Sequence, residues 1–192
     1  MPPDQKQQQK QIKKQLRKQF LTSRTQIDLE TWQLKNQRLC DRLSNWQVFR
    51  QAQTVLAFTS FRQEPDLQCL WQKFPDKVWG FPRCIGQNLI WHHVPILQFD
   101  RTMRSGAYGI LEPFPEQPLV EIPQVDLILV PAVACDRLGY RLGYGGGYYD
   151  RCLPSIQGYK SGIVFHEFYI DQLPHDPWDI QLDGVITDLE LT

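Results

Sequence analysis

The sequence predicts an α/β fold: a single domain with a layered, mostly parallel central sheet, flanked by helices and preceded by a basic N-terminal helix. Segments rich in β-branched and aromatic residues alternate with segments of helical periodicity, which is the order expected of βα units. One run, "VDLILVPAVAC" at 125–135, is apolar without alternation, as is typical of a central parallel strand buried on both faces. We expect residues 1–9 to form a flexible basic extension and residues 10–192 to form the domain.

Two helices are predicted in the first quarter of the chain. Apolar residues four apart form one stripe of a helix at 10–20 (Ile12, Leu16, Phe20). Lys13 and Arg17 are also four apart and therefore share a second face of the same helix. A second helix is expected at about 28–49, because three/four spacing of apolar residues follows Asp28, a plausible N-cap.

The remaining elements follow from composition. Six segments are predicted to be strands: 54–61, 77–83, 88–94, 125–135, 159–165 and 183–188. Pro65 opens a short helix, since proline suits the first turn of a helix. Residues 100–125 are rich in proline and glycine and are expected to be an irregular connection across the domain. A further short helix begins at Tyr148.

The charge of the chain is unevenly distributed. Formal net charge is zero, but residues 1–24 contain seven Lys or Arg and one acid, Asp4. This basic end either meets an anionic partner or is a solvated helical face, and composition alone favours neither reading. We expect no nucleic acid partner, because the basic residues have no aromatic residues interleaved with them.

The five cysteines are widely spaced, and none forms a CxxC pair. We therefore expect neither a zinc site nor a disulfide framework, and isolated thiols of this kind fit a reducing cytosol. The longest strongly apolar stretch, at 127–135, is too short to span a bilayer. The N-terminus is rich in Gln and Lys and lacks the apolar region of a secretory signal. The prediction is a cytoplasmic protein that does not bind membranes, whose oligomeric state, monomer or dimer, stays open.

The stretch "RLGYGGGYYDR" at 141–151 is the most informative motif. It follows the predicted central strand directly, and ligands of open α/β sheets bind beyond the carboxyl ends of the strands. Its glycines let backbone N–H groups approach an anion such as phosphate. Arg141 supplies a positive charge, and Asp150 is able to hold the magnesium that accompanies a nucleotide. The loop is neither a Walker A motif nor GxGxxG, and a tight turn that merely avoids strain is the alternative.

The longer stretch "LVPAVACDRLGYRLGYGGGYYDR" at 129–151 resembles the signature of the 5-formyltetrahydrofolate cyclo-ligase family. Four shorter segments also resemble family segments, in the same order along the chain: "KKQLR" at 13–17, "SFRQEPD" at 60–66, "FPR" at 81–83 and "LDGVITD" at 182–188. The resemblance implies an ATP-dependent enzyme that converts 5-formyltetrahydrofolate to 5,10-methenyltetrahydrofolate and releases ADP and phosphate. A relative that binds folate or nucleotide without turnover is the alternative.

The resemblance also implies roles for individual residues. ATP contacts are implied for the N-terminal basic segment and for the glycine-rich run: Lys13, Lys14, Arg17, Arg141, Leu142, Gly143, Tyr144, Gly145, Gly146, Gly147, Tyr148 and Tyr149. Folate contacts are implied for Thr59, Glu64, Tyr108 and Tyr148, with Glu64 accepting hydrogen bonds from the pterin ring. Magnesium ligation is implied for Asp150 and Asp183. Without the resemblance, Glu64 reads as an exposed turn residue before a proline.

Overall fold

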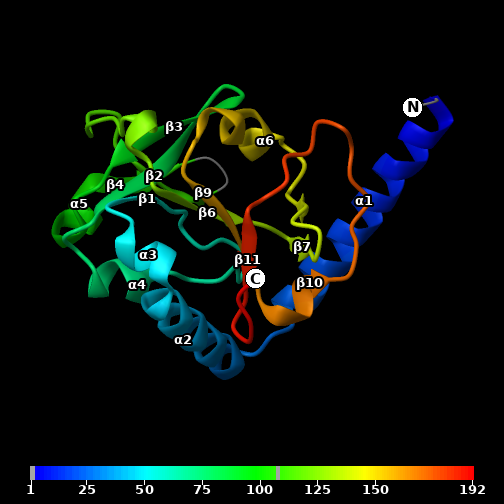
Figure 1. Cartoon of the computed structure of the whole chain (residues 1–192), viewed down its shortest axis with the longest axis horizontal. Helices are drawn as coiled ribbons and strands as arrows, with labels where there is room; N and C mark the ends of the chain where they lie inside the picture. The colour runs from blue at the N-terminus through cyan, green and yellow to red at the C-terminus, as the bar shows by residue number, and fades with distance from the viewer. Residues whose placement is uncertain (1–2, 107–108) are drawn as a thin grey trace.

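A computed structural model describes residues 3–106 and 109–192 and confirms the predicted fold class (Figure 1). Its main sheet has the order β11-β9-β6-β1-β2-β3. All neighbours in this sheet are parallel except β3, an antiparallel edge strand that forms a hairpin with β2. The strands are β1 (Thr54–Leu56), β2 (Val78–Ile85), β3 (Asn88–His93), β6 (Leu127–Pro131), β9 (Tyr159–Ile163) and β11 (Gly184–Ile186).

Helices flank this sheet. They are α1 (Pro3–Thr25), α2 (Leu29–Asn45), α3 (Gln47–Gln51), α4 (Gln68–Lys73), α5 (Phe99–Thr102) and α6 (Tyr148–Cys152), with short 3-10 turns at 96–98, 122–124, 153–155 and 166–168. Asp28 is confirmed as the N-cap of α2, since its Oδ1 accepts from the Thr31 N–H at 2.8 Å. Helix α1 begins at Pro3, so residues 3–9 are helical, whereas we expected a flexible extension. Among the described helices none has the length and apolar character needed to cross a membrane.

Two predicted elements are divided in the structure. The run at 125–135 forms β6, which ends at Pro131, and then β7 (Ala134–Asp136). Proline lacks the N–H that a ladder needs, so the chain leaves the main sheet there. Strand β7 instead pairs with β10 (Tyr169–Ile170) and β8 (Arg141–Leu142) in a second sheet. The helix expected at 28–49 is interrupted at Trp46, which separates α2 from α3. The connection at 100–125 is not wholly irregular, because β4 (Met103–Ser105) and β5 (Leu111–Pro113) form an antiparallel hairpin within it.

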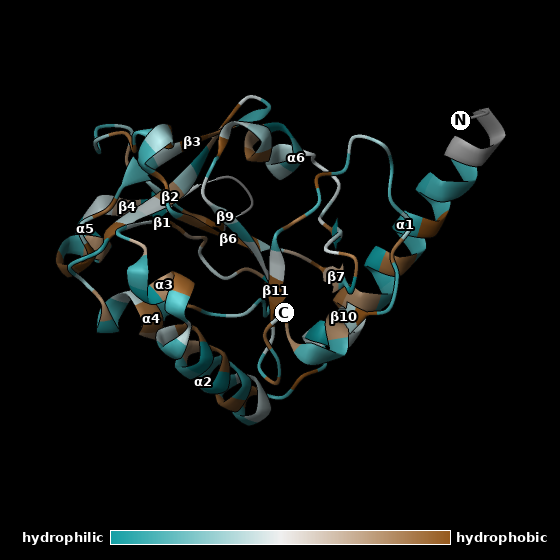
Figure 2. Ribbon diagram, viewed as in Figure 1, coloured by the Kyte–Doolittle hydropathy of each residue, from teal (hydrophilic) through white to brown (hydrophobic). Residues whose placement is uncertain are grey.

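Strand β6 is buried on both faces, as its continuous apolar run predicts. Leu127 and Leu129 pack in the hydrophobic cluster that includes the buried face of α2. Ile128 and Val130 pack in the other cluster, against which Leu16 and Phe20 of α1 lie, whereas Ile12 of the predicted stripe is exposed. Figure 2 shows the two long helices largely hydrophilic and interrupted by hydrophobic residues, as expected for amphipathic helices on the surface. Burial of the strand therefore follows directly from the position of these two helices.

The order in which the chain adds strands to the sheet reverses between β1 and β6, which are parallel neighbours. From β1 the chain passes to β2 on one side, and it later returns through β6, β9 and β11 on the other. The loops that leave the carboxyl ends of β1 and β6 therefore diverge at one point, where open α/β sheets form a ligand crevice. Residues 57–67 follow β1, and the segment from Ala132 to the glycine loop follows β6. Sheet topology thus brings the predicted folate loop and the predicted ATP loop to the same edge.

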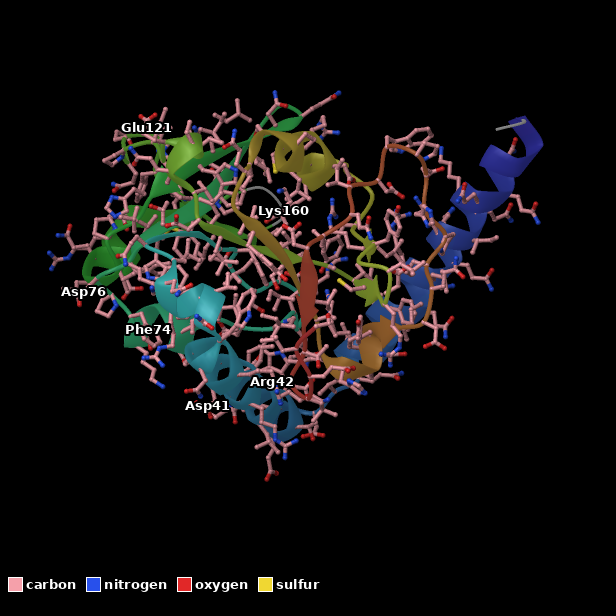
Figure 3. The ribbon with its side chains drawn as sticks, in the orientation of Figure 1. Asp41, Arg42, Phe74, Asp76, Glu121 and Lys160 are labelled. Carbon is pink, nitrogen blue, oxygen red and sulfur yellow. A yellow bond between two sulfur atoms is a disulfide. The ribbon has the colours of Figure 1, made fainter. Side chains whose placement is uncertain are left out.

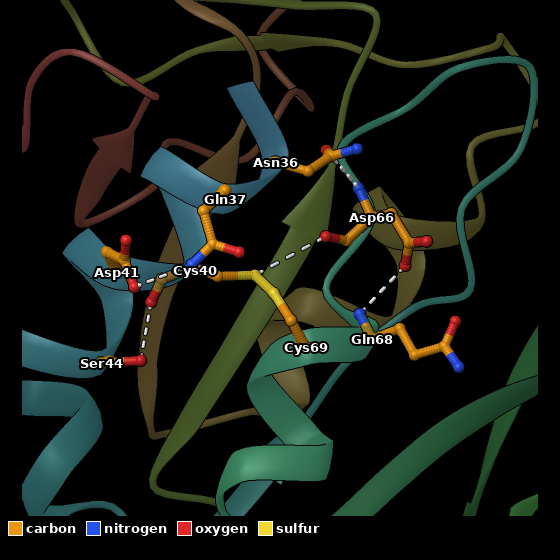
Figure 4. The surroundings of a disulfide bond; sticks show 8 residues. All are labelled: Asn36, Gln37, Cys40, Asp41, Ser44, Asp66, Gln68 and Cys69. Atoms are coloured by element: carbon orange, nitrogen blue, oxygen red, sulfur yellow. Dashed lines mark hydrogen bonds between the residues drawn. A yellow bond between two sulfur atoms is a disulfide. The ribbon is translucent and has the colours of Figure 1, made fainter. Parts of the chain in front are cut away.

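A disulfide joins Cys40 of α2 to Cys69 of α4, which corrects the prediction of isolated thiols (Figure 4). The Cys40 sulfur also lies 3.7 Å from the carbonyl oxygen of Asp66, whose N–H donates to Asn36 Oδ1 at 2.8 Å. The pairing was invisible in the spacing, because 29 residues separate two cysteines that only helix packing brings together. The inference of a reducing cytosol from unpaired thiols therefore loses its basis. Cys84, Cys135 and Cys152 are free.

We expect reduction of the Cys40–Cys69 disulfide to destabilise the protein by about 3 kcal/mol, because the bond constrains a long loop of the unfolded chain. For a domain of this size the melting temperature should fall by roughly 10 °C. Thermal unfolding of the wild type and of Cys40→Ser, with and without dithiothreitol, measures the effect. Cys84→Ser removes an exposed thiol and serves as the control. Free thiols at both positions in the untreated protein would contradict the pairing.

Candidate active site at the carboxyl edge of the sheet

The glycine-rich loop connects β8 to α6, as a strand-to-helix turn. Gly145 and Gly147 have φ angles of 101° and 68°, in a region that side-chain-bearing residues rarely adopt. A Cβ atom on Gly145 would lie 3.6 Å from the guanidinium carbon of Arg17. Glycine is therefore required for the left-handed turn, while a Cβ atom at position 145 would make only an ordinary van der Waals contact with Arg17.

Helix α1 supplies two of the predicted phosphate-binding cations. Arg17 donates through Nε to the carbonyl oxygen of Gly143 at 2.7 Å. Lys13, one turn earlier, is buried and donates to Asp176 Oδ2 at 2.6 Å and to Asp179 Oδ2 at 2.5 Å. Lys14 is exposed, since the next position in a helix is rotated by about 100°. The structure thus brings Arg17 to the glycine loop and Lys13 to Asp176 and Asp179, and it leaves Lys14 on the outside.

Arg141 and Asp150 form an ion pair across the glycine loop. Arg141 Nη2 donates to Asp150 Oδ1 at 2.6 Å, and the guanidinium lies over the Tyr149 ring, 5.4 Å from its centroid. Burial lowers the pKa of Arg17, while the negative charges of Asp179 and Asp150 oppose that shift. Charges therefore alternate through the site, in the order Lys13, Asp179, Arg17, Asp150, Arg141. Each of these cations therefore has a carboxylate whose charge opposes its own.

Asp183 lies directly before β11, and its carboxylate accepts a hydrogen bond from a backbone N–H group. Its Oδ2 accepts from the Lys160 N–H at 2.7 Å, and its carbonyl oxygen accepts from the Tyr159 hydroxyl. Lys160 is labelled in Figure 3 beside β9 and β11. Within the described residues no contact joins Asp183 to Asp150. Asp179 and Asp150 are the two carboxylates whose charges act on Arg17. The sequence did not indicate a role for Asp179.

Asp176 and Asp179 lie in the segment "LPHDPWD", which composition alone marks only as a proline-rich surface loop. The loop is held by α1 at one point besides Lys13 and by Tyr140, which lies just before β8. The Gln9 side chain donates to the carbonyl oxygen of His175 at 2.6 Å, and the His175 ring stacks on Tyr140 at 3.9 Å. The one signal available in the sequence was a pair of acids three residues apart, shortly before the last predicted strand.

Glu64 is buried in the loop that follows β1, in contrast to an exposed turn residue. Its Oε2 accepts from the Phe61 N–H at 3.1 Å, and Trp32 donates to its carbonyl oxygen at 3.2 Å. Arg24, a second residue that the sequence reasoning missed, lies with Nη2 3.9 Å from Glu64 Oε1. Burial raises the pKa of Glu64 to about 7, although the charge of Arg24 and the hydroxyl of Tyr144 oppose the shift. This carboxyl therefore titrates near neutral pH.

The other predicted folate contacts are bonded to neighbouring backbone. Thr59 donates to the carbonyl oxygen of Leu111 at 2.9 Å, and the Tyr148 hydroxyl donates to that of Gly86 at 3.2 Å. Tyr108 lies outside the described residues. Tyr144 links the two loops, since its hydroxyl accepts from Arg24 and its ring packs on Phe61 with 6.1 Å between centroids. Tyr144 and Arg24 thus connect the loop that carries Glu64 to the glycine loop.

A cavity of about 710 Å³ lies elsewhere on the molecule. It is lined by the carboxyl half of α2 and by the C-terminal segment: Arg38, Asp41, Arg42, Asn45, Trp46, Gln47, Asp188, Leu189 and Leu191. Asp41 and Arg42 are labelled on α2 in Figure 3. None of the predicted site residues lines this cavity, so we assign the chemistry to the carboxyl edge of the sheet.

The arrangement suits a polyphosphate next to a second, mostly uncharged ligand. Arg17 and Arg141 lie against a glycine loop whose backbone is able to contact phosphate oxygens, and Lys13 pairs with Asp179, whose charge acts on Arg17. Buried Glu64 lies across the crevice and is suited to accept hydrogen bonds from ring N–H groups.

Comparisons with known proteins agree with this description. The model of the 5-formyltetrahydrofolate cyclo-ligase family matches residues 9–188. The 5-formyltetrahydrofolate cyclo-ligase of Escherichia coli K12 is 30% identical over 178 residues, which cover 82% of this chain and 90% of that protein. The NMR structure of Aquifex aeolicus 5,10-methenyltetrahydrofolate synthetase has a TM-score of 0.83 and 32% identity, covering 94% of this chain and 91% of that one. A 5,10-methenyltetrahydrofolate synthetase from Mycoplasma pneumoniae has a TM-score of 0.74 and 26% identity, covering 92% and 98%.

Proposed function

This chain belongs to the 5-formyltetrahydrofolate cyclo-ligase family, and we propose that it uses ATP to convert 5-formyltetrahydrofolate into 5,10-methenyltetrahydrofolate, with release of ADP and phosphate. The observation that carries the ATP-dependent step is the placement of Arg17 on the backbone of the glycine loop, with Arg141 paired to Asp150 across the loop and Lys13 paired to Asp179, whose charge acts on Arg17. Arg24 links this loop, through Tyr144, to buried Glu64. A folate ring and a triphosphate are the two ligands that these groups fit.

In this proposal Lys13, Arg17 and Arg141 hold the phosphates of ATP together with the backbone N–H groups of Gly143 to Gly147. Arginine suits the task because its planar guanidinium makes paired hydrogen bonds to phosphate oxygens. Phosphate competes with the carboxylates that now neutralise Lys13 and Arg141. Binding of ATP is therefore expected to exchange these ion pairs for contacts to phosphate.

A magnesium ion is the expected companion of the triphosphate, and the oxygen donors of this site fit one. Arg141 binds Oδ1 of Asp150, and Lys13 binds Oδ2 of Asp179, which leaves the other oxygen of each carboxylate for a metal. Carboxylate oxygens are the ligands that Mg²⁺ prefers. We assign the metal to Asp150 and Asp179, with Asp183 as the alternative that the sequence resemblance implies. The metal would supply charge neutralisation on the transferred phosphoryl group.

The reaction then proceeds in two steps. The formyl oxygen of the folate attacks the γ-phosphorus of ATP; the bond to ADP breaks, and the oxygen becomes phosphorylated. The neighbouring folate nitrogen attacks the activated formyl carbon and loses its proton, and the carbon–oxygen bond breaks to release phosphate. Glu64 orients the pterin ring, with Thr59 and Tyr148 near it, and the closed site must exclude water from the activated intermediate.

Incubation of the purified protein with Mg-ATP and 5-formyltetrahydrofolate tests this function. We expect the near-ultraviolet absorbance of the methenyl product to appear with ATP and not without it, with one ADP per product. Because the formyl oxygen leaves with the phosphate, an ¹⁸O label in the formyl group should be recovered in inorganic phosphate. Tight binding of both ligands by calorimetry with no ADP formed would instead identify a relative that binds without turnover.

A further inference from the structure

A third cation of α1 lies on the same face as Lys13 and Arg17. Arg24 follows Lys13 by eleven residues, which corresponds to three full turns plus about 20°. The side chain is almost completely buried, with 1% of its surface exposed. A buried arginine requires several acceptors to offset the loss of its hydration, so its partners indicate its purpose.

The guanidinium of Arg24 binds three different segments of the crevice. Its Nε donates to the carbonyl oxygen of Arg62 at 3.0 Å, in the loop after β1. Its Nη1 donates to the carbonyl oxygen of Ala132 at 3.2 Å, just beyond β6. Its Nη2 donates to the hydroxyl of Tyr144 in the glycine loop and lies 3.9 Å from Glu64 Oε1. One side chain therefore spans the point where the two loops diverge.

The loop that presents Glu64 has an unfavourable backbone that needs such support. Arg62 and Gln63 have φ angles of 49° and 56°, and such consecutive left-handed residues are rare unless glycine occupies them. The hydrogen bond from Arg24 to the Arg62 carbonyl holds this turn, and Gln63 donates to the carbonyl oxygen of Ile27 at 3.0 Å. The turn in turn directs the Glu64 carboxylate into the crevice.

Tyr144 connects this support to the glycine loop. Arg24 lies 5.7 Å from the centroid of its ring, in addition to the hydrogen bond to its hydroxyl. The backbone next to Tyr144 is held by Arg17 through the carbonyl oxygen of Gly143. We expect phosphate to draw Arg17 away from that carbonyl and thereby to shift Tyr144 relative to Arg24 and Glu64. Glu64 Oε1 lies 3.9 Å from Arg24 Nη2, and the Tyr144 hydroxyl also acts on this carboxylate. A ligand that hydrogen-bonds to Glu64 therefore shares it with Arg24 and Tyr144.

We propose that Arg24 is a positioning residue that couples the two substrate sites, because it holds Glu64 of the folate loop and Tyr144 of the ATP loop on one guanidinium. Nucleotide binding at the glycine loop then strengthens folate binding at Glu64, and folate strengthens nucleotide binding by the same factor. The inference rests on the proposed function for the identity of the two ligands. It adds a coupling between them and the two side chains that transmit it.

Calorimetry measures this coupling directly. The dissociation constant of 5-formyltetrahydrofolate is determined without nucleotide and with a saturating non-hydrolysable ATP analogue and magnesium. For the wild type we expect binding to be about tenfold tighter with the analogue. Tyr144→Phe removes one hydroxyl and Arg24→Met removes the guanidinium, and each should lower this ratio to about one. The double variant should show no further loss, and Lys18→Met, on the exposed side of α1, should keep the wild-type ratio.

The outcomes separate coupling from a merely structural role. A structural role would weaken folate binding equally with and without the analogue, which would leave the ratio unchanged and overturn the inference. A wild-type ratio of one would also overturn it. If Arg24→Met fails to fold, Tyr144→Phe alone decides, because it preserves the ring and its packing. If the protein forms the methenyl product but the variants keep the wild-type ratio of folate dissociation constants, the coupling is rejected and the proposed reaction stands. If the ratio changes as expected but no methenyl product forms, only the proposed reaction is rejected.

Discussion

Replacing Asp150 with asparagine is expected to lower kcat for methenyl formation on the order of a thousandfold and to leave the protein folded. Asparagine keeps the shape of the side chain and still accepts a hydrogen bond from Arg141. What is lost is the negative charge that would hold the metal beside the triphosphate. Turnover at saturating ATP and folate, across a titration of magnesium, measures the effect, with thermal unfolding as a check on the fold.

The matching variants Asp179→Asn and Asp183→Asn separate the two possible metal sets. We expect Asp179→Asn to lose turnover as Asp150→Asn does, because the proposal places both carboxylates on the metal. Asp183→Asn should keep turnover within a few-fold and change mainly the melting temperature, since its carboxylate accepts from the Lys160 N–H. The opposite result, with Asp183→Asn inactive and Asp179→Asn active, would establish the set that the sequence resemblance implies.

Glu64→Gln is expected to weaken folate binding at pH 8 by tenfold to about a hundredfold while leaving ATP binding nearly unchanged. A hydrogen bond to a charged acceptor contributes roughly 1.5–3 kcal/mol, and the amide replaces one acceptor oxygen with a donor. The same change should make the protein more stable at pH 8 by about 2–3 kcal/mol, because the wild type ionises a buried carboxyl. A gain in stability together with a loss of binding is typical of a functional residue.

The pH dependence follows from the pKa of Glu64, which burial raises from 4.5 to about 7. Between these values the folded protein keeps a proton that the unfolded chain has lost, so this stabilisation is complete below pH 4.5 and disappears as the pH rises through 7. The groups that face Glu64 are Arg24, Tyr144 and Tyr149, and the pKa of each tyrosine is raised. Folate binding should weaken as the pH falls below 7, because protonated Glu64 accepts fewer hydrogen bonds.

Stability and folate affinity measured from pH 5 to pH 8 test both trends. The wild type should lose stability as the pH rises through 7 and lose folate affinity as the pH falls below 7. Glu64→Gln should show neither of these two changes. Glu116→Gln changes an exposed carboxyl and serves as the control. A wild-type affinity for folate that is constant across this range would contradict the role of an ionised Glu64.

Much of the fold was predictable because it depends on local pattern. The uninterrupted apolar run of β6 indicated burial on both faces, and Asp28 marked the start of α2. Errors arose where a single residue redirects the chain. Pro131 ends β6 and sends the next residues into a second sheet, and Trp46 separates α2 from α3. The pairing of Cys40 with Cys69 depends on which helices become neighbours, which no spacing rule records.

The sequence by itself determined the class of the fold, the glycine loop and the basic face of α1, since composition and helical periodicity are local properties. Only the tertiary structure brought Asp179 to Lys13 and Arg17, kept Asp183 on the backbone of β9, and buried Arg24 against Glu64 and Tyr144. The physical reason is that charge pairing and desolvation depend on distances between segments that are 23 to 166 residues apart in the sequence. Those distances are set by the sheet topology, at the point where the loops after β1 and β6 diverge.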